Sequence, residues 1–375
     1  MPAPRKYPLE LRERAVRMYR TAEPKPVIRK VIALIPAHNE ADAIADSIQG
    51  LYGQTVPPQR VIVVADNCTD ATVAIADSLG AEVFETRGNR HKKAGGLNQV
   101  LAGLLPDLHD DDVVLVTDAD SALDPGFVAC GVEHLAKGYG GVGGTFRGGP
   151  GGGFVGHLQR NEYARYSRDV KRLGGKCLVL TGTAAMFRVQ VLRHISQARL
   201  KGRLPAGDGL GGIYDTSVLT EDNELTFAVL HLGYQVLSPE DCTLTTEVML
   251  TWKALWDQRL RWKRGAVENC VQYGLTRITW RYWGRQLLSM AGLLVTAVYM
   301  VTIAYSLASD SFRVHEFWLW VSLVFVIERV VTVRERGWKR MLLAASMYEL
   351  LFDFLLQACH AKAYLDSVFR RERAW

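Results

Sequence analysis

Runs of branched apolar residues alternate with helical segments through the first third of this chain, and each run ends in a polar loop. Residues 27–37, 60–66, 81–87 and 112–120 form the runs, and residues 40–54, 70–80 and 94–105 between them have helical character. Short runs of Val, Ile and Leu bounded by helices are typical of parallel strands buried on both faces. The pattern predicts a doubly wound α/β domain, which binds its ligands at the carboxyl ends of the strands.

The loops after these strands carry the polar chemistry. They read PAHNE (36–40), DNCTD (66–70), RGNRHKKAGGLN (87–98) and TDAD (117–120). Asn39 and Asp70 could simply cap the helices that follow, while Lys93 precedes a helix N-terminus, where phosphate binds readily. Neither a G-x-G-x-x-G nor a Walker A pattern is present, so the loops predict neither a dinucleotide site nor a P-loop.

Asp118 and Asp120 flank Ala119 where the fourth strand ends. Residues two apart in a strand share a face, and two carboxylates on one face repel each other unless a cation lies between them. Mg²⁺ or Mn²⁺ held by one or two carboxylates and by diphosphate oxygens fits this arrangement. The alternative for an isolated Asp-x-Asp is an ordinary turn.

The C-terminal third contains long apolar segments. Residues 286–309 carry no formal charge and, at ~1.5 Å per residue, would span a hydrocarbon core as a helix. A second run, 317–333, contains Glu328 and Arg329, and a third, 341–361, contains Glu349 and Asp353. We expect two to four membrane spans, with the third segment open between a buried span, a re-entrant hairpin and an interfacial helix.

Charge distribution predicts how the chain is oriented. The segments before the first apolar run and after the second are basic, whereas the segment between those runs is not, which predicts that the N-terminal part faces the cytoplasm. A net charge of +6 is too diffuse to predict nucleic-acid binding. The six cysteines show no paired spacing, which is typical of a reducing setting. We therefore expect an integral protein of the cell membrane.

Four segments follow from these patterns. Residues 1–26 are predicted to form a basic amphipathic helix, and 27–250 the α/β catalytic domain. Residues 251–285 are expected to be interfacial helices, and 286–375 the membrane region with a basic tail. The stretch LWDQRLRWKRG (255–265) has two tryptophans among basic residues, which suits a membrane interface or the closure of an active site lying against a membrane.

Seven motifs together resemble family 2 glycosyltransferases. In chain order they are PAHNE, DNCTD, KAGGLN, TDAD, GTAAMF (182–187), TED (220–222) and QRLRW (258–262). Their order and spacing are similar to those of the membrane-embedded synthases of β-linked polysaccharides, such as cellulose, hyaluronan, chitin oligosaccharide and poly-N-acetylglucosamine synthases. The resemblance covers about residues 30–265.

The resemblance implies a GT-A fold and an inverting hexosyltransferase that uses a UDP-sugar donor and Mg²⁺ or Mn²⁺. Asp222 would be the general base beside Glu221, and Asp120 the main metal ligand together with Asp118. Arg261 and Trp262 would join them at the reacting centre. The residues implied to bind substrate are Pro36, Ala37, Glu40, Asp66, Lys93, Asp118, Gly182, Thr183, Gln258 and Arg259. For Asp222 the alternative is a helix cap.

The chain also departs from the larger synthases. Those have transmembrane helices before the catalytic domain, where this sequence has only the short basic helix. Few spans predict either homo-oligomers or short additions to a saccharide or lipid acceptor. Transfer to a polyprenyl phosphate stays an alternative, although such enzymes normally lack QRLRW. A non-enzymatic membrane scaffold is disfavoured by the intact Asp118, Asp120 and Asp222.

Overall fold

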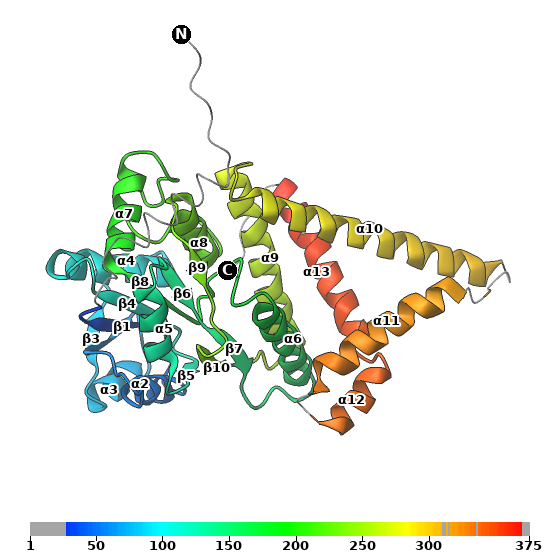
Figure 1. The fold of residues 1–375 in the computed structure, drawn as a ribbon, viewed down its shortest axis with the longest axis horizontal. Coiled ribbons are helices and arrows are strands. Elements are labelled where there is room, and N and C mark those ends of the chain that lie inside the picture. The colour runs from blue at the N-terminus through cyan, green and yellow to red at the C-terminus, as the bar shows by residue number, and fades with distance from the viewer. Residues whose placement is uncertain (1–27, 310–312, 314–315, 335–336, 370–375) are drawn as a thin grey trace, which may run out of the picture.

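The computed structural model describes residues 28–309, 313, 316–334 and 337–369. The predicted basic amphipathic helix therefore lies outside the described residues. An α/β body and a triangular arrangement of C-terminal helices make up the described chain (Figure 1).

The body is built on a seven-stranded mixed sheet in the order β3-β2-β1-β4-β8-β6-β9. Its strands are β1 (Val31–Ala37), β2 (Arg60–Ala65), β3 (Glu82–Glu85), β4 (Val113–Thr117), β6 (Gly141–Gly143), β8 (Ala184–Arg188) and β9 (Val236–Leu237). The first four strands pair in parallel, and β8 pairs antiparallel with both β4 and β6. This mostly parallel sheet confirms the predicted α/β class.

Helices cover both faces of the sheet, because alternate residues of each strand point to opposite sides. Ala33 and Ile35 of β1 pack in one core with α2 (Ile44–Tyr52), α3 (Thr72–Ser78) and α5 (Phe127–Ala136). Ile32 and Leu34 pack in a second core with α4 (Lys92–Leu104), α7 (Val189–Leu200) and α8 (Glu221–His231). The short 3-10 helix η1 (Leu105–Asp107) follows α4.

A second, three-stranded sheet was not predicted. It has the order β5-β10-β7, with β5 (Ser121–Leu123), β7 (Thr145–Gly148) and β10 (Thr243–Thr246). β5 begins directly after Asp120, so β10 is brought beside the end of β4. The small sheet thus adds residues from position 243 onward to the edge where the predicted site lies.

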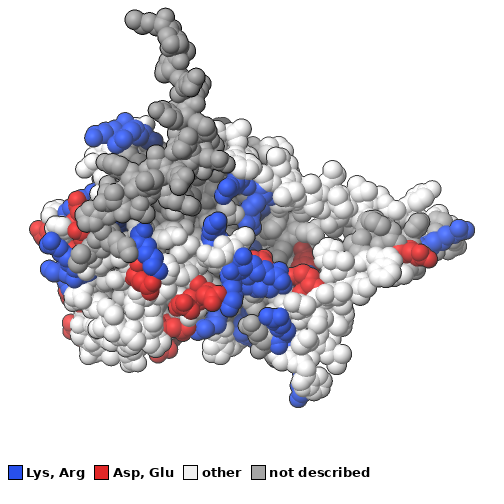
Figure 2. Space-filling model, in the orientation of Figure 1, with Lys and Arg blue, Asp and Glu red and all other residues white. Residues whose placement is uncertain are grey.

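The C-terminal helices leave the body and return to it. α9 (Trp252–Tyr273) packs along α13 (Leu350–Val368) and near α6 (Gly153–Arg172), while α10 (Trp280–Ala308) runs outward and α11 (Glu316–Thr332) comes back (Figure 1). α12 (Trp338–Ala345) precedes α13. In Figure 2 the arm made by α10 and α11 is largely without charged residues between its tip and its junction with the body.

Among the described residues, α10 is the helix long and apolar enough to cross a membrane by itself. The pair α12 and α13 passes the same test only if it counts as one span, and it bends by 66°. α11 has 17 residues and is shorter than a full span. The described residues therefore offer one or two candidate spans, at or below the lower limit of the predicted two to four.

The charges inside the apolar segments are paired. Arg329 on α11 donates to Glu349, the N-cap residue of α13, and to Asp353 in its first turn, so the two carboxylates face the same arginine. Arg165 on α6 also donates to Glu349, at 2.6 Å. Glu328 accepts from Arg168 of α6 at 2.7 Å. The bend before α13 is thus tied to the body through α6.

Candidate active site

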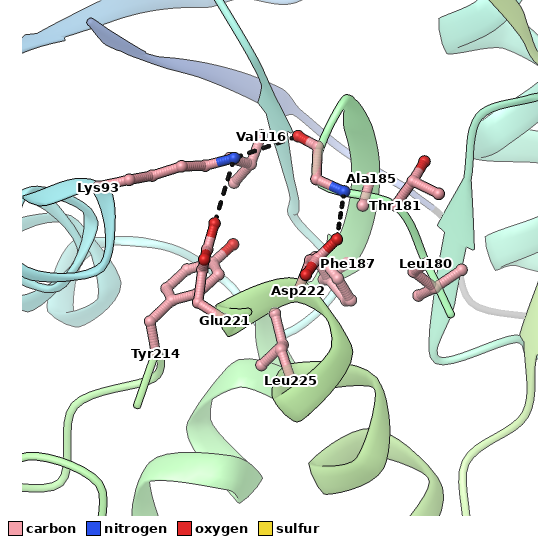
Figure 3. Close-up of a pocket in the computed structure, with 11 residues that line it drawn as sticks. Lys93, Val116, Leu180, Thr181, Ala185, Phe187, Tyr214, Glu221, Asp222 and Leu225 are labelled. Atoms are coloured by element: carbon pink, nitrogen blue, oxygen red, sulfur yellow. Dashed lines mark hydrogen bonds and ion pairs between the residues drawn. The ribbon is translucent and has the colours of Figure 1, made fainter. Parts of the chain in front are cut away.

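A small pocket lies where the strands of the large sheet end and the helices α4 and α8 begin (Figure 3). It is lined by Lys93, Val116, Leu180, Thr181, Gly182, Ala185, Phe187, Tyr214, Glu221, Asp222 and Leu225. The KAGGLN, GTAAMF and TED motifs all contribute to this wall. Residues separated by more than a hundred positions in sequence therefore meet at the predicted edge of the sheet.

Lys93 is at the centre of the polar contacts. Its ammonium donates to a carboxylate oxygen of Asp118 at 2.5 Å and to the carbonyl of Gly182 at 3.2 Å. Glu221 lies 3.6 Å from the same nitrogen. Burial works against the charge of Lys93, but Asp118 and Glu221 outweigh it and raise its pKa. Lys93 is therefore a fixed cation in the site.

Asp222 faces Lys93 from the first turn of α8. One carboxylate oxygen accepts from the backbone N–H of Gly182 at 2.9 Å, and the other accepts from the N–H of Asn223 at 2.8 Å. Burial, and then the negative charge of Glu221, raise its pKa to about 6. A carboxylate held by two N–H groups with its pKa near neutrality is suited to accept a proton. Asp222 lies within the first turn of α8, and the N-cap position belongs to Thr220.

Several carboxylates gather beside Lys93. Burial raises the pKa of both Asp118 and Asp120; the charge of Asp120 adds to the rise at Asp118, and the charge of Glu247 adds to the rise at Asp120. Asp120 accepts from Ser121 at 3.0 Å and from Thr246 at 3.4 Å. Glu40, after β1, has its pKa raised to about 7 by burial and then by Asp120 and Glu247. The strand ends therefore carry an excess of negative charge.

These carboxylates fit a divalent cation that a ligand helps to hold. Among the described residues, His, Cys, Asp and Glu side chains form no group of three that could bind a metal alone. Asp118 is already bonded to Lys93, which leaves Asp120 as the better protein ligand. Mg²⁺ and Mn²⁺ typically take one or two carboxylates and complete their shell with phosphate oxygens and water. The residues present match that donor set.

The loops after β1 and β2 form one connected surface. Pro36 and Ala37 pair with Val64 and Ala65 at the ends of the two strands. Asp66 accepts from Thr86 at 2.7 Å, which fixes the orientation of its carboxylate. Asn39 does not cap α2 as its position suggested. It adopts a left-handed φ of 58°, and its side chain accepts from the N–H of Thr69 at 2.7 Å.

The GTAAMF segment joins the two halves of the site. The carbonyl of Thr183 accepts from the N–H of Asp118 at 3.1 Å and from the hydroxyl of Thr117 at 3.0 Å. Gly182 then contacts both Lys93 and Asp222. β8 therefore holds the strand that carries the acidic pair against the helix that carries Asp222.

QRLRW lies in the first half of α9 and is held by α6. Arg259 donates to Gln258 and, at 2.6 Å, to Glu162 of α6. Its guanidinium also lies 4.4 Å from the centre of the Trp262 ring.

Arg261 has no hydrogen-bond or ion-pair partner among the described residues. It lies near Lys92, whose pKa is lowered by burial and then by the positive charge of Arg261. Two neighbouring cations favour an anion between α4 and α9.

α9 is also bound to the TED segment. Asn269 donates to the carbonyl of Thr220 at 3.1 Å, and Tyr273 donates to Glu224 at 2.5 Å. A Cβ atom on Gly265 would lie 2.4 Å from the Thr220 hydroxyl, so only glycine permits this approach. QRLRW and Asp222 thus sit on two helices in direct contact.

Four further residues belong to this neighbourhood without a local sequence signal: Glu162, Tyr163, Tyr214 and Glu247. Glu162 and Tyr163 reach Arg259 from almost a hundred positions away. Tyr214 lines the pocket from an irregular segment, and Glu247 follows the unpredicted strand β10. These four residues reach the site through the tertiary fold, so no local sequence pattern could have identified them.

Known proteins match this chain in sequence and in fold. Residues 32–196 match the family described as glycosyl transferase family 2. The probable glycosyltransferase YdaM of Bacillus subtilis (strain 168) is 29% identical over 63% of this chain and 55% of its own length. The poly-beta-1,6-N-acetyl-D-glucosamine synthase of Staphylococcus aureus (strain MSSA476) is 25% identical over 63% of this chain and 54% of its own length. The chain thus spans about half the length of these curated relatives.

A solved structure covers nearly the whole chain. The mannosyltransferase PcManGT from Pyrobaculum calidifontis, in complex with GDP-Man and Mn²⁺, superposes with a TM-score of 0.61 over 96% of this chain and 95% of that one, at 17% sequence identity. This likeness concerns the fold, including the C-terminal helices. The similarity to glycosyl transferase family 2 rests on residues 32–196, less than half of the chain.

Proposed function

We propose that this protein is an inverting hexosyltransferase that moves a sugar from a UDP-sugar to an acceptor hydroxyl at the cytoplasmic face of a membrane, forming a β-linkage. The observation that carries the proposal is the convergence of Asp222 and the Lys93–Asp118 pair on Gly182. This places a proton acceptor of raised pKa beside a cation and a carboxylate pair suited to a metal diphosphate. The similarity of residues 32–196 to glycosyl transferase family 2 supports the reaction class.

In this reaction, Asp222 accepts the proton of the acceptor hydroxyl as that oxygen bonds to the anomeric carbon. The bond between the anomeric carbon and the diphosphate oxygen breaks, and its electron pair leaves with UDP. Attack opposite the leaving group inverts the configuration. Raising the pKa of Asp222 to about 6 makes it a stronger base than an ordinary aspartate while it is still ionised at neutral pH.

The leaving diphosphate needs positive charge. Asp120, assisted by Asp118, would hold Mg²⁺ or Mn²⁺, and a bound cation would neutralise charge developing on the diphosphate. The Mn²⁺ bound by PcManGT together with its nucleotide sugar supports this assignment. From the protein itself, Lys93 and Arg261 supply fixed positive charge on either side.

Donor and acceptor would occupy separate parts of the site. Pro36, Ala37, Glu40 and Asp66 would line the nucleoside, with Thr183 and Gly182 beneath the sugar. Gln258 and Arg259 would help to close the site, and Trp262 would offer the acceptor sugar a flat apolar face. A poly-N-acetylglucosamine synthase among the relatives favours a saccharide acceptor. A lipid acceptor is the alternative.

The position of α9 supports catalysis at a membrane face. QRLRW lies on a helix packed against α13 and close to the start of α10, the candidate span. An acceptor held at the membrane would therefore meet Trp262 and Asp222 without leaving the interface.

The test is to incubate membranes containing the full chain with a panel of radiolabelled UDP-sugars and Mn²⁺ or Mg²⁺. We expect one UDP-sugar to label a product, and labelling to stop when the metal is chelated. Asp120→Ala should weaken metal-dependent UDP binding. Absence of transfer from every UDP-sugar of the panel would refute the proposed activity, and metal-independent transfer would refute the role of Asp120.

A further inference from the structure

A group of cations without acidic partners lies where α9, α10 and α13 meet. It consists of Lys263, directly after QRLRW, and Arg285, directly before the uncharged part of α10. Among the described residues, no carboxylate lies within salt-bridge distance of either side chain, whereas most basic residues of α9 and α13 are paired. Figure 2 shows Lys and Arg side chains gathered near the junction of the body with the C-terminal helices.

Lys263 is enclosed by three helices. Its ammonium donates to the hydroxyl of Ser289 on α10 at 3.1 Å and lies 4.8 Å from the centre of the Tyr364 ring on α13. Tyr364 in turn donates to Gln286 at 2.8 Å. Burial, and then the positive charge of Arg285, lower the pKa of Lys263 to about 8. A half-buried ammonium with a hydroxyl, a ring and a second cation as neighbours lacks compensation for its charge.

The position of Arg285 adds to this imbalance. It lies in the second turn of α10, and Arg281 lies in the first, whose residues include no acidic one. Cations are unfavourable at a helix N-terminus, because the backbone N–H groups there already present positive charge. Ser289 follows Arg285 by four positions and shares its helical face. Two cations, a hydroxyl and a helix N-terminal end therefore face one region.

We infer that Lys263, Arg285 and Ser289 bind the phosphate of an anionic membrane-lipid headgroup where α9, α10 and α13 meet. A phosphate oxygen would accept from both cations and from the hydroxyl, and would neutralise the excess charge. The lipid's acyl chains would lie along α10, whose exposed side chains include Leu287, Leu288 and Leu294. Such a lipid would hold α9, and with it QRLRW, at a fixed depth in the interface.

Native mass spectrometry of the detergent-purified full chain tests the inference. The protein would be incubated with phosphatidylglycerol, with phosphatidylcholine, or with inorganic phosphate. We expect retention of phosphatidylglycerol in preference to phosphatidylcholine, and roughly tenfold weaker retention by the double variant K263Q/R285Q. The conservative pair K263R/R285K should retain the lipid. The control K201Q/R203Q removes the same charge from exposed positions after α7 and should bind as wild type.

Each result of this experiment either supports or overturns the lipid site. Equal lipid retention by K263Q/R285Q and K201Q/R203Q would overturn the site. Displacement of phosphatidylglycerol by millimolar inorganic phosphate would keep the phosphate chemistry and overturn the lipid assignment. If K263Q/R285Q were too unstable to purify, loss of retention in K263Q alone, with retention in K263R, would still support the site. Retention in both single variants would refute it.

Discussion

Asp222 is the residue whose environment bears most directly on the chemistry. Its two carboxylate oxygens are held by backbone N–H groups, and burial with the nearby Glu221 raises its pKa to about 6. Below that pH the carboxyl is protonated and cannot accept the acceptor's proton. We expect kcat/KM to fall roughly tenfold per pH unit below about pH 6 and to level off above it. A rate profile without an acid limb down to about pH 5 would contradict the assignment of Asp222 as base.

Glu162 is expected to act as a positioning residue for QRLRW. It holds Arg259, which lies over the ring of Trp262. Glu162→Gln removes the charge and should lower the transfer rate roughly tenfold by loosening that ring, with UDP affinity unchanged. The exposed Glu133→Gln, which breaks only a surface pair with Lys137, is the matched control. Equal rates for the two variants, measured with saturating donor, would show that Arg259 is positioned by other contacts.

Sequence patterns could predict residues near the strand ends but not their partners. Lys93 and Asp118 come together as expected, because parallel strands deliver their loops to one edge. Asp222 was expected at the site from the family resemblance, and it meets the same Gly182 as Lys93. Sequence patterns could not predict that Arg259 contacts Glu162 or that Asp120 contacts Thr246, because each contact joins elements about a hundred positions apart. Asn39 was misjudged as a cap because its partner is on a neighbouring loop.

Among the elements, α9 links the membrane side to the TED segment. Gly265 allows it to approach Thr220 at a distance that a Cβ atom would block. Gly265→Ala should cost about 1–3 kcal/mol of stability and lower activity by displacing α9. Gly103→Ala on α4, where an added Cβ meets nothing within 4 Å, should instead preserve or raise stability. Thermal unfolding and transfer assays on both variants would show whether this close approach matters.

The fold explains why a carboxylate lies at the bend between α12 and α13. Glu349 is buried and accepts from Arg165 and Arg329. Glu349→Ala would leave both arginines without their shared carboxylate and should destabilise the protein by about 3–5 kcal/mol. The surface variant Glu240→Ala, which frees only the exposed Lys171, should change stability little. Similar urea midpoints for the two variants would show that the bend is held by packing alone.

At the scale of the whole molecule, hydrophobic periodicity and composition could predict three features. These are the α/β class, the helix-rich C-terminal region and the position of QRLRW beside that region. The second sheet and the return of α13 onto α9 were not predictable, since both depend on contacts between distant segments. The predicted division into segments 1–26, 27–250, 251–285 and 286–375 stays a prediction. The described structure is an α/β body whose helix α9 packs along α13 and contacts α10, the candidate span.

The central claim is that an aspartate on α8 deprotonates the acceptor beside a bound nucleotide. Its most direct test compares wild type with Asp222→Asn in two assays on one preparation: radiolabelled sugar transfer and equilibrium UDP binding with Mn²⁺. The amide keeps an oxygen for the N–H of Gly182, so folding and UDP affinity should be preserved. We expect transfer to fall by about a thousandfold or more while the UDP dissociation constant changes less than about twofold. Transfer at the wild-type rate by Asp222→Asn would contradict the account.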